Sequence, residues 1–209
     1  MLKIFGNFIE MGDTSEYLII SFSPGSLPLS DRWRNNSLSA DFLANYWGTF
    51  FPVHDGVSMR HQREMTDAVN YIVNELLENA MKFSYGRKDK AIQIGLYLSH
   101  QELRFYVSNT IQHDTVEPFQ RYIQQLLTED AGELYLRQLE RNAADEGGHQ
   151  SRLGFLTILY DYRAELAWKF ETITQGAEEV MVVTTMVQLA IERSSDETDY
   201  RRGSDGSEG

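Results

Sequence analysis

Three polar side chains, Glu75, Asn79 and Lys82, follow one another at steps of four and three residues in a strongly helical stretch from about residue 66 to residue 84. At this spacing they lie on one stripe of a helix, each about one turn from the next. A carboxylate, an amide and an ammonium group in such a row can together address a phosphate group and its metal ion. The stripe is therefore a candidate site for phosphate chemistry.

The same stretch carries a full apolar stripe, which predicts that the helix packs on the core of the protein. Its members recur at steps of three and four: Val69, Ile72, Val73, Leu76, Leu77, Ala80 and Phe83. Polar residues beside such a stripe usually form a solvated helix face. Spacing alone therefore leaves two interpretations of the polar stripe open, a phosphate site and a plain solvent-exposed surface.

The segment from Glu75 to Lys82, with Asn79 between them, resembles the N-box of the GHKL ATPase superfamily, which includes gyrase and the histidine kinases. It is most similar to the compact serine kinases of bacterial partner switching, of the anti-sigma-factor kinase type, and to SiaB-like and cyanobacterial-type ATP-binding proteins. The resemblance implies that the Asn79 oxygen holds Mg²⁺ on the phosphates of ATP. It also implies that Glu75 polarises the attacking hydroxyl as a general base and that Lys82 neutralises phosphate charge.

A glycine motif that follows a strand in that superfamily is only partly matched. Its adenine-reading Asp corresponds to Asn109, within residues 107–111, and both of its glycines are absent. As a neutral acceptor, Asn109 should bind the adenine amino group more weakly than a carboxylate would. The alternative interpretation is that Asn109 merely begins a turn after a strand, where Asn is common.

The phosphate-covering loop of the superfamily corresponds to residues 150–155, in which Leu153 and Gly154 match. By the resemblance, these two residues and the loop before them cover the phosphates of the nucleotide. Gln150 and Arg152 stand where the family has glycines. Arg152 either donates to a phosphate, closes the loop over an empty pocket, or is an exposed residue at a helix start.

The charge balance limits the partners that the chain can have. Its 209 residues include 19 basic and 31 acidic side chains, which give a formal net charge of −12. So acidic a chain is a poor candidate for binding nucleic acid or an anionic membrane surface. It has no cysteine, so disulfides and thiolate metal sites are excluded. Without a signal peptide or a long apolar stretch, we expect a cytoplasmic protein.

The order of the expected elements predicts an α+β domain with one sheet. Strands are expected over about 17–23, 91–98, 103–109, 164–173 and 180–191, and helices over about 37–47, 66–84, 153–160 and twice within a helical insertion at about 115–146. The resemblance adds that this is an α/β sandwich of the GHKL, or Bergerat, ATP-binding type, whose mixed, mainly antiparallel sheet is covered on one face by helices. The single domain would span residues 1–191, with a disordered acidic tail at 192–209.

Two functions follow from the resemblance. The first is an ATP- and Mg²⁺-dependent serine/threonine kinase that phosphorylates a STAS-like partner protein, with a PP2C-type phosphatase as a further partner and a homodimer as its assembly. The second is a catalytically degenerate protein of the same fold that binds a regulatory partner. Its binding surface would come from the inserted helices and from exposed aromatic residues such as Trp33, Tyr46 and Trp47.

Overall fold

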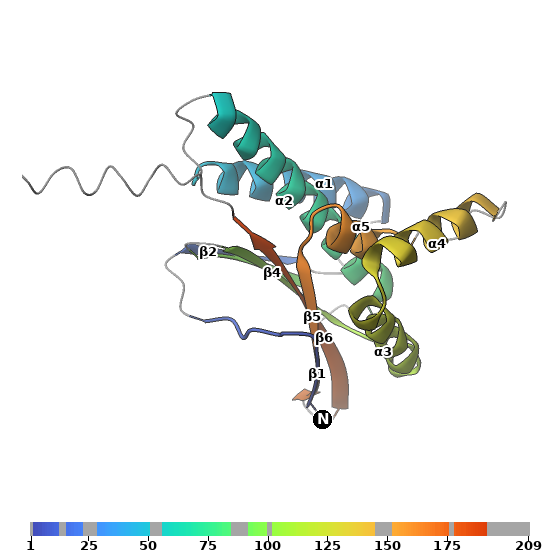
Figure 1. Ribbon diagram of the computed structural model, residues 1–209. Helices are drawn as coiled ribbons and strands as arrows, with labels where there is room; N and C mark the ends of the chain where they lie inside the picture. The colour runs from blue at the N-terminus through green and yellow to red at the C-terminus, as the bar shows by residue number, and fades with distance from the viewer. Residues whose placement is uncertain are drawn as a thin grey trace, which may run out of the picture.

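The computed structural model describes residues 2–12, 16–22, 29–50, 56–84, 92–99, 102–144, 152–175 and 178–191, without the side chains of 22, 29–35, 56–58, 175 and 178. Within these ranges helices pack on a six-stranded sheet (Figure 1). The elements are β1 (Leu2–Phe5), β2 (Glu16–Phe22), α1 (Leu29–Gly48), α2 (Gly56–Phe83), β3 (Ile92–Leu98), β4 (Glu102–Thr110), α3 (His113–Thr128), α4 (Ala131–Ala144), α5 (Gly154–Tyr160), β5 (Glu165–Gln175) and β6 (Glu178–Ala190).

The sheet has the strand order β1-β5-β6-β4-β3-β2, and each neighbouring pair is antiparallel. The expectation of a mixed sheet is therefore wrong for the described strands. The chain between β4 and β5, which contains α3, α4 and α5, does return β5 in the same direction as β4. However, β6 lies between these two strands and opposes both, so no parallel pair forms.

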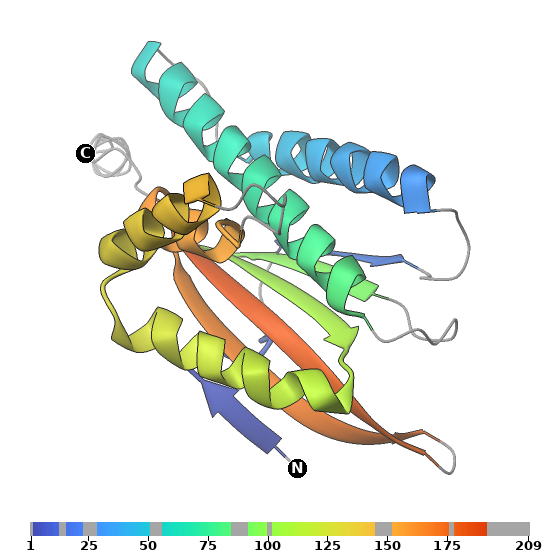
Figure 2. The ribbon, with the colours of Figure 1, turned by 90° about the vertical axis from the view of Figure 1, so that its right-hand side faces the viewer.

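The helices lie on one face of this sheet, as Figure 2 shows. Because successive strand residues point to opposite faces, alternate residues of the central strands meet the helices. Phe105 of β4 and Trp168 of β5 are fully buried there, together with Ile72 and Leu76 of α2. The helix α1 packs against α2 through Leu43 and its neighbours, which are also buried. The sheet thus provides a rigid base on which α2 and α3 are fixed.

A strap formed by residues 6–12 crosses the other face of the sheet, between β1 at one edge and β2 at the opposite edge (Figure 1). It covers a small second cluster that includes Tyr106 and Met186. The Tyr106 hydroxyl donates to the carbonyl of Ile9 at 2.9 Å, and the N–H of Ile9 points at the Met186 sulfur at 3.4 Å. The strap therefore adds a thin third layer beneath the sheet.

The strap begins with a close approach of backbone to backbone at Gly6. This residue has φ +73°, and a Cβ there would lie 2.7 Å from the carbonyl oxygen of Leu166. Only glycine adopts this conformation at little cost and leaves room for the strand beneath. Further along, Lys169 forms an ion pair with Glu10 at 2.9 Å, which holds the strap against β5.

Several expectations need correction against these elements. The strand β1 was not predicted, and the helix expected from about residue 66 begins ten residues earlier, at Gly56. Phe83 was assigned to the apolar core stripe but is 48% exposed, because α2 ends there beyond the edge of the core. Trp47 was expected on the surface but is fully buried under α2. The expected tail at 192–209 and the side chain of Trp33 lie outside the described residues.

None of the helices in the described part of the chain is long and apolar enough to cross a membrane.

Candidate functional site

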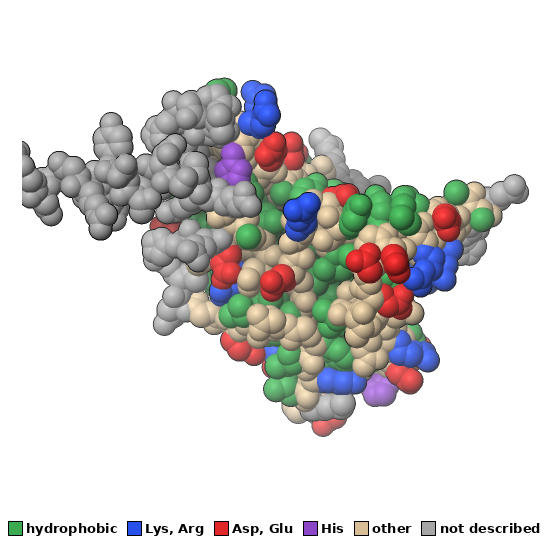
Figure 3. All heavy atoms as spheres, viewed as in Figure 1, with side chains coloured by type: hydrophobic (Ala, Val, Ile, Leu, Met, Phe, Trp, Pro, Cys, Tyr) green, Lys and Arg blue, Asp and Glu red, His purple; other side chains and the backbone are tan. Residues whose placement is uncertain are grey.

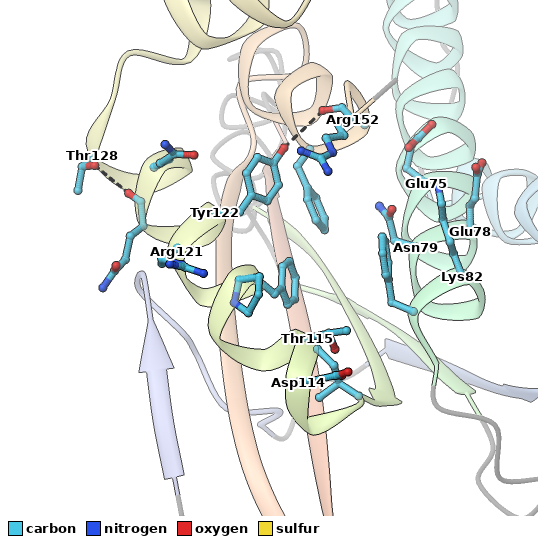
Figure 4. A pocket seen from close by; sticks show the side chains of 18 residues that line it. Glu75, Glu78, Asn79, Lys82, Asp114, Thr115, Arg121, Tyr122, Thr128 and Arg152 are labelled. Carbon is cyan, nitrogen blue, oxygen red and sulfur yellow. Dashed lines mark hydrogen bonds between the residues drawn. The ribbon is translucent and has the colours of Figure 1, made fainter. Parts of the chain in front are cut away.

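A cavity of about 910 Å³ opens between α2 and α3, with the start of α5 at one end (Figure 4). Its volume falls within the range of cavities that hold small-molecule ligands. Four segments line it: the last turns of α2, the residue Ile111 after β4, one side of α3, and the chain that enters α5. The isolated bridge between Ser84 and Ile111 ties the end of α2 to the end of β4 beneath this opening.

The wall from α2 carries the polar stripe seen in the sequence. Glu75, Asn79 and Lys82 all line the cavity, and Glu78 joins them from the same side of the helix. Figure 4 shows these four side chains along one side of the cavity. The apolar stripe of α2 turns into the core, so the polar stripe is left to face α3 across the opening. The prediction that spacing would bring the three residues together on one helix face is thus met by the structure.

The carboxylate of Glu75 lies against Gly154, at the start of α5. A Cβ at residue 154 would overlap Oε2 of Glu75 and would lie 2.9 Å from its Cδ. Burial raises the pKa of Glu75, the charge of Glu78 raises it further, and Lys82 partly lowers it again. A carboxyl group whose pKa is raised toward neutrality is better suited to accept a proton from a hydroxyl.

The opposite wall is formed by α3, which the resemblance does not describe. Asp114 and Thr115 lie at its start, and Arg121 and Tyr122 lie two turns further on. Burial raises the pKa of Tyr122 to about 12, against a smaller lowering effect of Arg152. The Tyr122 hydroxyl therefore stays protonated at neutral pH, and it points at the carbonyl oxygen of Arg152 at 3.4 Å.

The chain enters α5 through a residue with an unusual backbone. Arg152 has φ +52°, in the left-handed region that glycine adopts freely and that costs other residues about 1–2 kcal/mol. This is a position where the resembled loop carries a glycine, so the backbone is glycine-like although the residue is not. The Arg152 side chain lines the cavity. Strained residues of this kind often occur at binding sites, where the strain fixes a side chain.

The charged groups of the cavity influence one another through space, but the described ones form no hydrogen bond or ion pair with each other. Among the described residues, no hydrogen bond or ion pair is formed by the side chains of Glu75, Asn79, Lys82, Asp114 or Arg152. The Nζ atom of Lys82 lies over the ring of Phe83, at 5.7 Å from the centroid. Polar groups gathered in a cavity without mutual partners can instead bind a ligand of complementary charge.

Two of the predicted site residues lie beside the cavity rather than on its wall. Asn109 is within β4 and buried, and its amide donates to the carbonyl of Thr110 at 3.0 Å. Leu153 packs against the core. Gln150 and the glycines before it lie outside the described residues. Of the six predicted residues, the structure therefore gathers Glu75, Asn79, Lys82 and Gly154 around one cavity.

Sequence reasoning did not select the α3 wall, which includes Asp114, Arg121 and Tyr122. The sequence did contain a pattern typical of this helix. Phe119 and Tyr122 fall on the apolar side of an amphipathic stretch, and Asp114 lies in its first turn. That pattern predicts a helix, but it does not tell which helix the stretch will face.

The described residues contain no group of three or more His, Asp or Glu side chains that could hold a metal ion alone. In nucleotide sites, Mg²⁺ usually takes one or two protein oxygens together with phosphate oxygens and water. The unpartnered oxygen of Asn79, with the carboxylates of Glu75 and Glu78 on the same wall, fits that kind of site.

Together the fold and the cavity define an α+β protein whose antiparallel sheet carries helices on one face and a charged pocket between two of them. No protein-family model and no curated protein matches the chain. Its function must therefore be argued from the pocket itself.

Proposed function

We propose that this protein is an ATP- and Mg²⁺-dependent serine/threonine kinase of the GHKL superfamily, acting on a STAS-like protein in a partner-switching pathway. The observation that carries the proposal is the row of Glu75, Asn79 and Lys82 along one wall of an open cavity. The proposed membership of the GHKL superfamily rests on the resemblance of this row to the N-box. The cavity supplies a place for a nucleotide.

Phosphoryl transfer depends mainly on positioning and on neutralisation of charge. Lys82 and Arg152 bring positive charge to the cavity from α2 and from the entry to α5. Neither side chain is paired with a carboxylate among the described residues, so both are available for phosphate oxygens. An Arg at residue 152 can donate several N–H groups to a phosphate, where glycines would offer only backbone N–H groups.

Asn79 would hold Mg²⁺ through its side-chain oxygen, with the phosphates completing the coordination. The bound ion would neutralise phosphate charge as the transferred group moves. Glu75 would accept the proton of the serine or threonine hydroxyl as that oxygen attacks the terminal phosphorus of ATP. The bond from this phosphorus to the bridging oxygen would break, and ADP would leave with that oxygen. The raised pKa of Glu75 supports this role, because a stronger base takes that proton more readily.

Titration calorimetry with Mg²⁺-ATP tests the proposal, with Asn79→Ala beside the unchanged protein. We expect saturable binding that the variant weakens at least tenfold, about 1.4 kcal/mol. Asn74→Ala is the matched control, because Asn74 lies on the same helix, pairs with Asn70 and does not line the cavity. Absence of binding at millimolar nucleotide, or equal effects of both substitutions, would contradict the proposal.

A second function, a protein-binding module without catalysis, is favoured by one feature of α4. This helix has no buried residue, and Leu136 is 61% exposed while the neighbouring Tyr160 is 52% exposed. Figure 3 shows hydrophobic side chains gathered over this part of the surface. Exposed apolar groups on a helix that projects from the domain are typical of a partner contact. Failure of the nucleotide titration would leave this function as the better explanation.

A further inference from the structure

The two ends of the cavity differ in chemistry. At one end lie Glu75 and Arg152, which carry full charges (Figure 4). At the other end, Asp114 and Thr115 lie at the start of α3 (Figure 4). Around them the wall is apolar and is formed by Phe83, Ile111, Pro118 and Phe119. A nucleotide has the same asymmetry, with charged phosphates at one end and a flat base at the other.

The apolar end has the features of a base site. Phe83 lines the cavity and is 48% exposed, and Nζ of Lys82 lies 5.7 Å from the centroid of its ring. The exposed part of the ring is available for contact. The ring of Phe119 on the opposite wall is held in place by a stacked contact with Phe155 and an edge contact with Trp168. An aromatic ring gives a nucleotide base a face to pack against.

Asp114 provides a hydrogen-bond acceptor at the apolar end of the cavity. Its carboxylate has no hydrogen bond or ion pair within the described part of the chain, while the hydroxyl of neighbouring Thr115 already donates to the carbonyl of Gln112 at 2.7 Å. Asn109, which the resemblance places near adenine, does not line the cavity. An ionised carboxylate also accepts a hydrogen bond more strongly than an amide does.

We infer that the base of the bound nucleotide lies at this end and that Asp114 accepts a hydrogen bond from its exocyclic amino group. The inference rests on the proposed function, since it requires that ATP occupies the cavity. It makes Asp114, five residues beyond Asn109, a specificity-determining residue for adenine. The amino group would exchange water for a charged acceptor, and a base without that group would lack this hydrogen bond.

The test compares two ligands that differ only in that amino group. ATP and purine riboside triphosphate, each with Mg²⁺, are titrated into the unchanged protein and into Asp114→Ala. We expect the unchanged protein to bind ATP about tenfold more tightly than the amino-free analogue, and the ratio to fall to about one in the variant. Glu117→Ala is the control, because Glu117 is exposed on the same helix outside the cavity and its loss should leave the ratio unchanged.

The ratio of the two affinities also distinguishes recognition of the base by Asp114 from a purely structural role of this residue. Asp114 lies in the first turn of α3, where a carboxylate stabilises a helix. A purely structural role would weaken both ligands equally and leave the ratio intact, which would overturn the inference. If the unchanged protein binds ATP with a ratio that Asp114→Ala does not alter, only the inference fails. If ATP does not bind at all, the proposed function fails with it.

Discussion

The carboxylate of Glu75 occupies the space that a side chain at residue 154 would need, so Gly154 is what allows the proposed base to lie at the entry to α5. The two residues come from segments far apart in the chain, one from α2 and one from α5. Their contact joins the N-box-like stripe to the second predicted motif. It also gives the glycine a reason to be present that does not depend on any turn.

Substitution of Gly154 by Ala should displace the Glu75 carboxylate. We expect ATP turnover, measured as ADP release, to fall about tenfold or more, because a small misplacement of a catalytic group is costly. The double variant Gly154→Ala with Glu75→Gln should lose no more than Glu75→Gln alone, since residues that act as a unit are not additive.

The control for this substitution is Gly12→Ala, where a Cβ would meet only a carbonyl oxygen at 3.9 Å. Equal turnover in Gly154→Ala and Gly12→Ala would show that the close contact does not position Glu75.

Glu75→Gln should make the protein more stable at neutral pH. Because the folded protein raises the pKa of Glu75 above its ordinary value of 4.5, the folded state binds that proton more tightly than the unfolded state does. The free energy of unfolding therefore falls as the pH rises from the ordinary value through the raised one. Gln cannot ionise, so the variant escapes this loss.

Urea unfolding of both proteins at about pH 4 and about pH 8 checks the sign. We expect similar stability at the lower pH and an advantage for the variant at the higher pH. The exposed Glu117→Gln serves as the control for general loss of negative charge. A variant that is less stable than the unchanged protein at the higher pH would contradict the raised pKa.

Arg152→Gly should relieve backbone strain and weaken nucleotide binding at once. Gly tolerates φ +52° without the steric penalty of Arg, so we expect a gain in stability of up to about 1 kcal/mol. The lost guanidinium should lower Mg²⁺-ATP affinity about tenfold.

Arg163→Gly is the matched control for that prediction, because Arg163 has φ +50° and does not line the cavity. It should gain similar stability in thermal unfolding and keep the affinity of the unchanged protein. The assignment of Arg152 to phosphate would be wrong if both variants bound Mg²⁺-ATP equally well.

Gly6→Ala should destabilise the protein by about 2 kcal/mol, because it combines a positive φ with a close approach to the carbonyl of Leu166. A fall in the melting temperature, compared with Gly12→Ala, is the measurement. Equal melting temperatures in the two variants would mean that the strap does not need its present path.

The elements that the sequence predicted best are those with a strong local period. The apolar stripe of α2 and the alternation of Ile92, Ile94 and Leu96 in β3 depend only on neighbouring residues, and the structure confirms both except at Phe83. The short strand β1 was missed because its partner is β5, which lies far along the sequence. Four residues carry too little pattern to predict such a pairing.

The same distinction applies to the candidate site. Glu75, Asn79 and Lys82 were found because one helix fixes their spacing. The α3 wall that faces them was not, since Asp114 and Tyr122 reach the cavity only through the packing of α3 on the sheet. Asn109 shows the limit of motif matching: its position in β4 is as expected, but packing around the strand buries it.

The strap has a consequence for how the protein folds. The contacts of the strap and of β1 are among the most distant along the chain, since Ile9 meets Met186 across 177 residues and Lys3 of β1 meets Gln120 of α3 across 117. Closing such long loops lowers the entropy of the chain before these contacts form and stabilise the fold. Hairpins such as β5 and β6 can form early from local contacts, while β1 and the strap require most of the sheet. We therefore expect the domain to fold slowly, with β1 and the strap forming last.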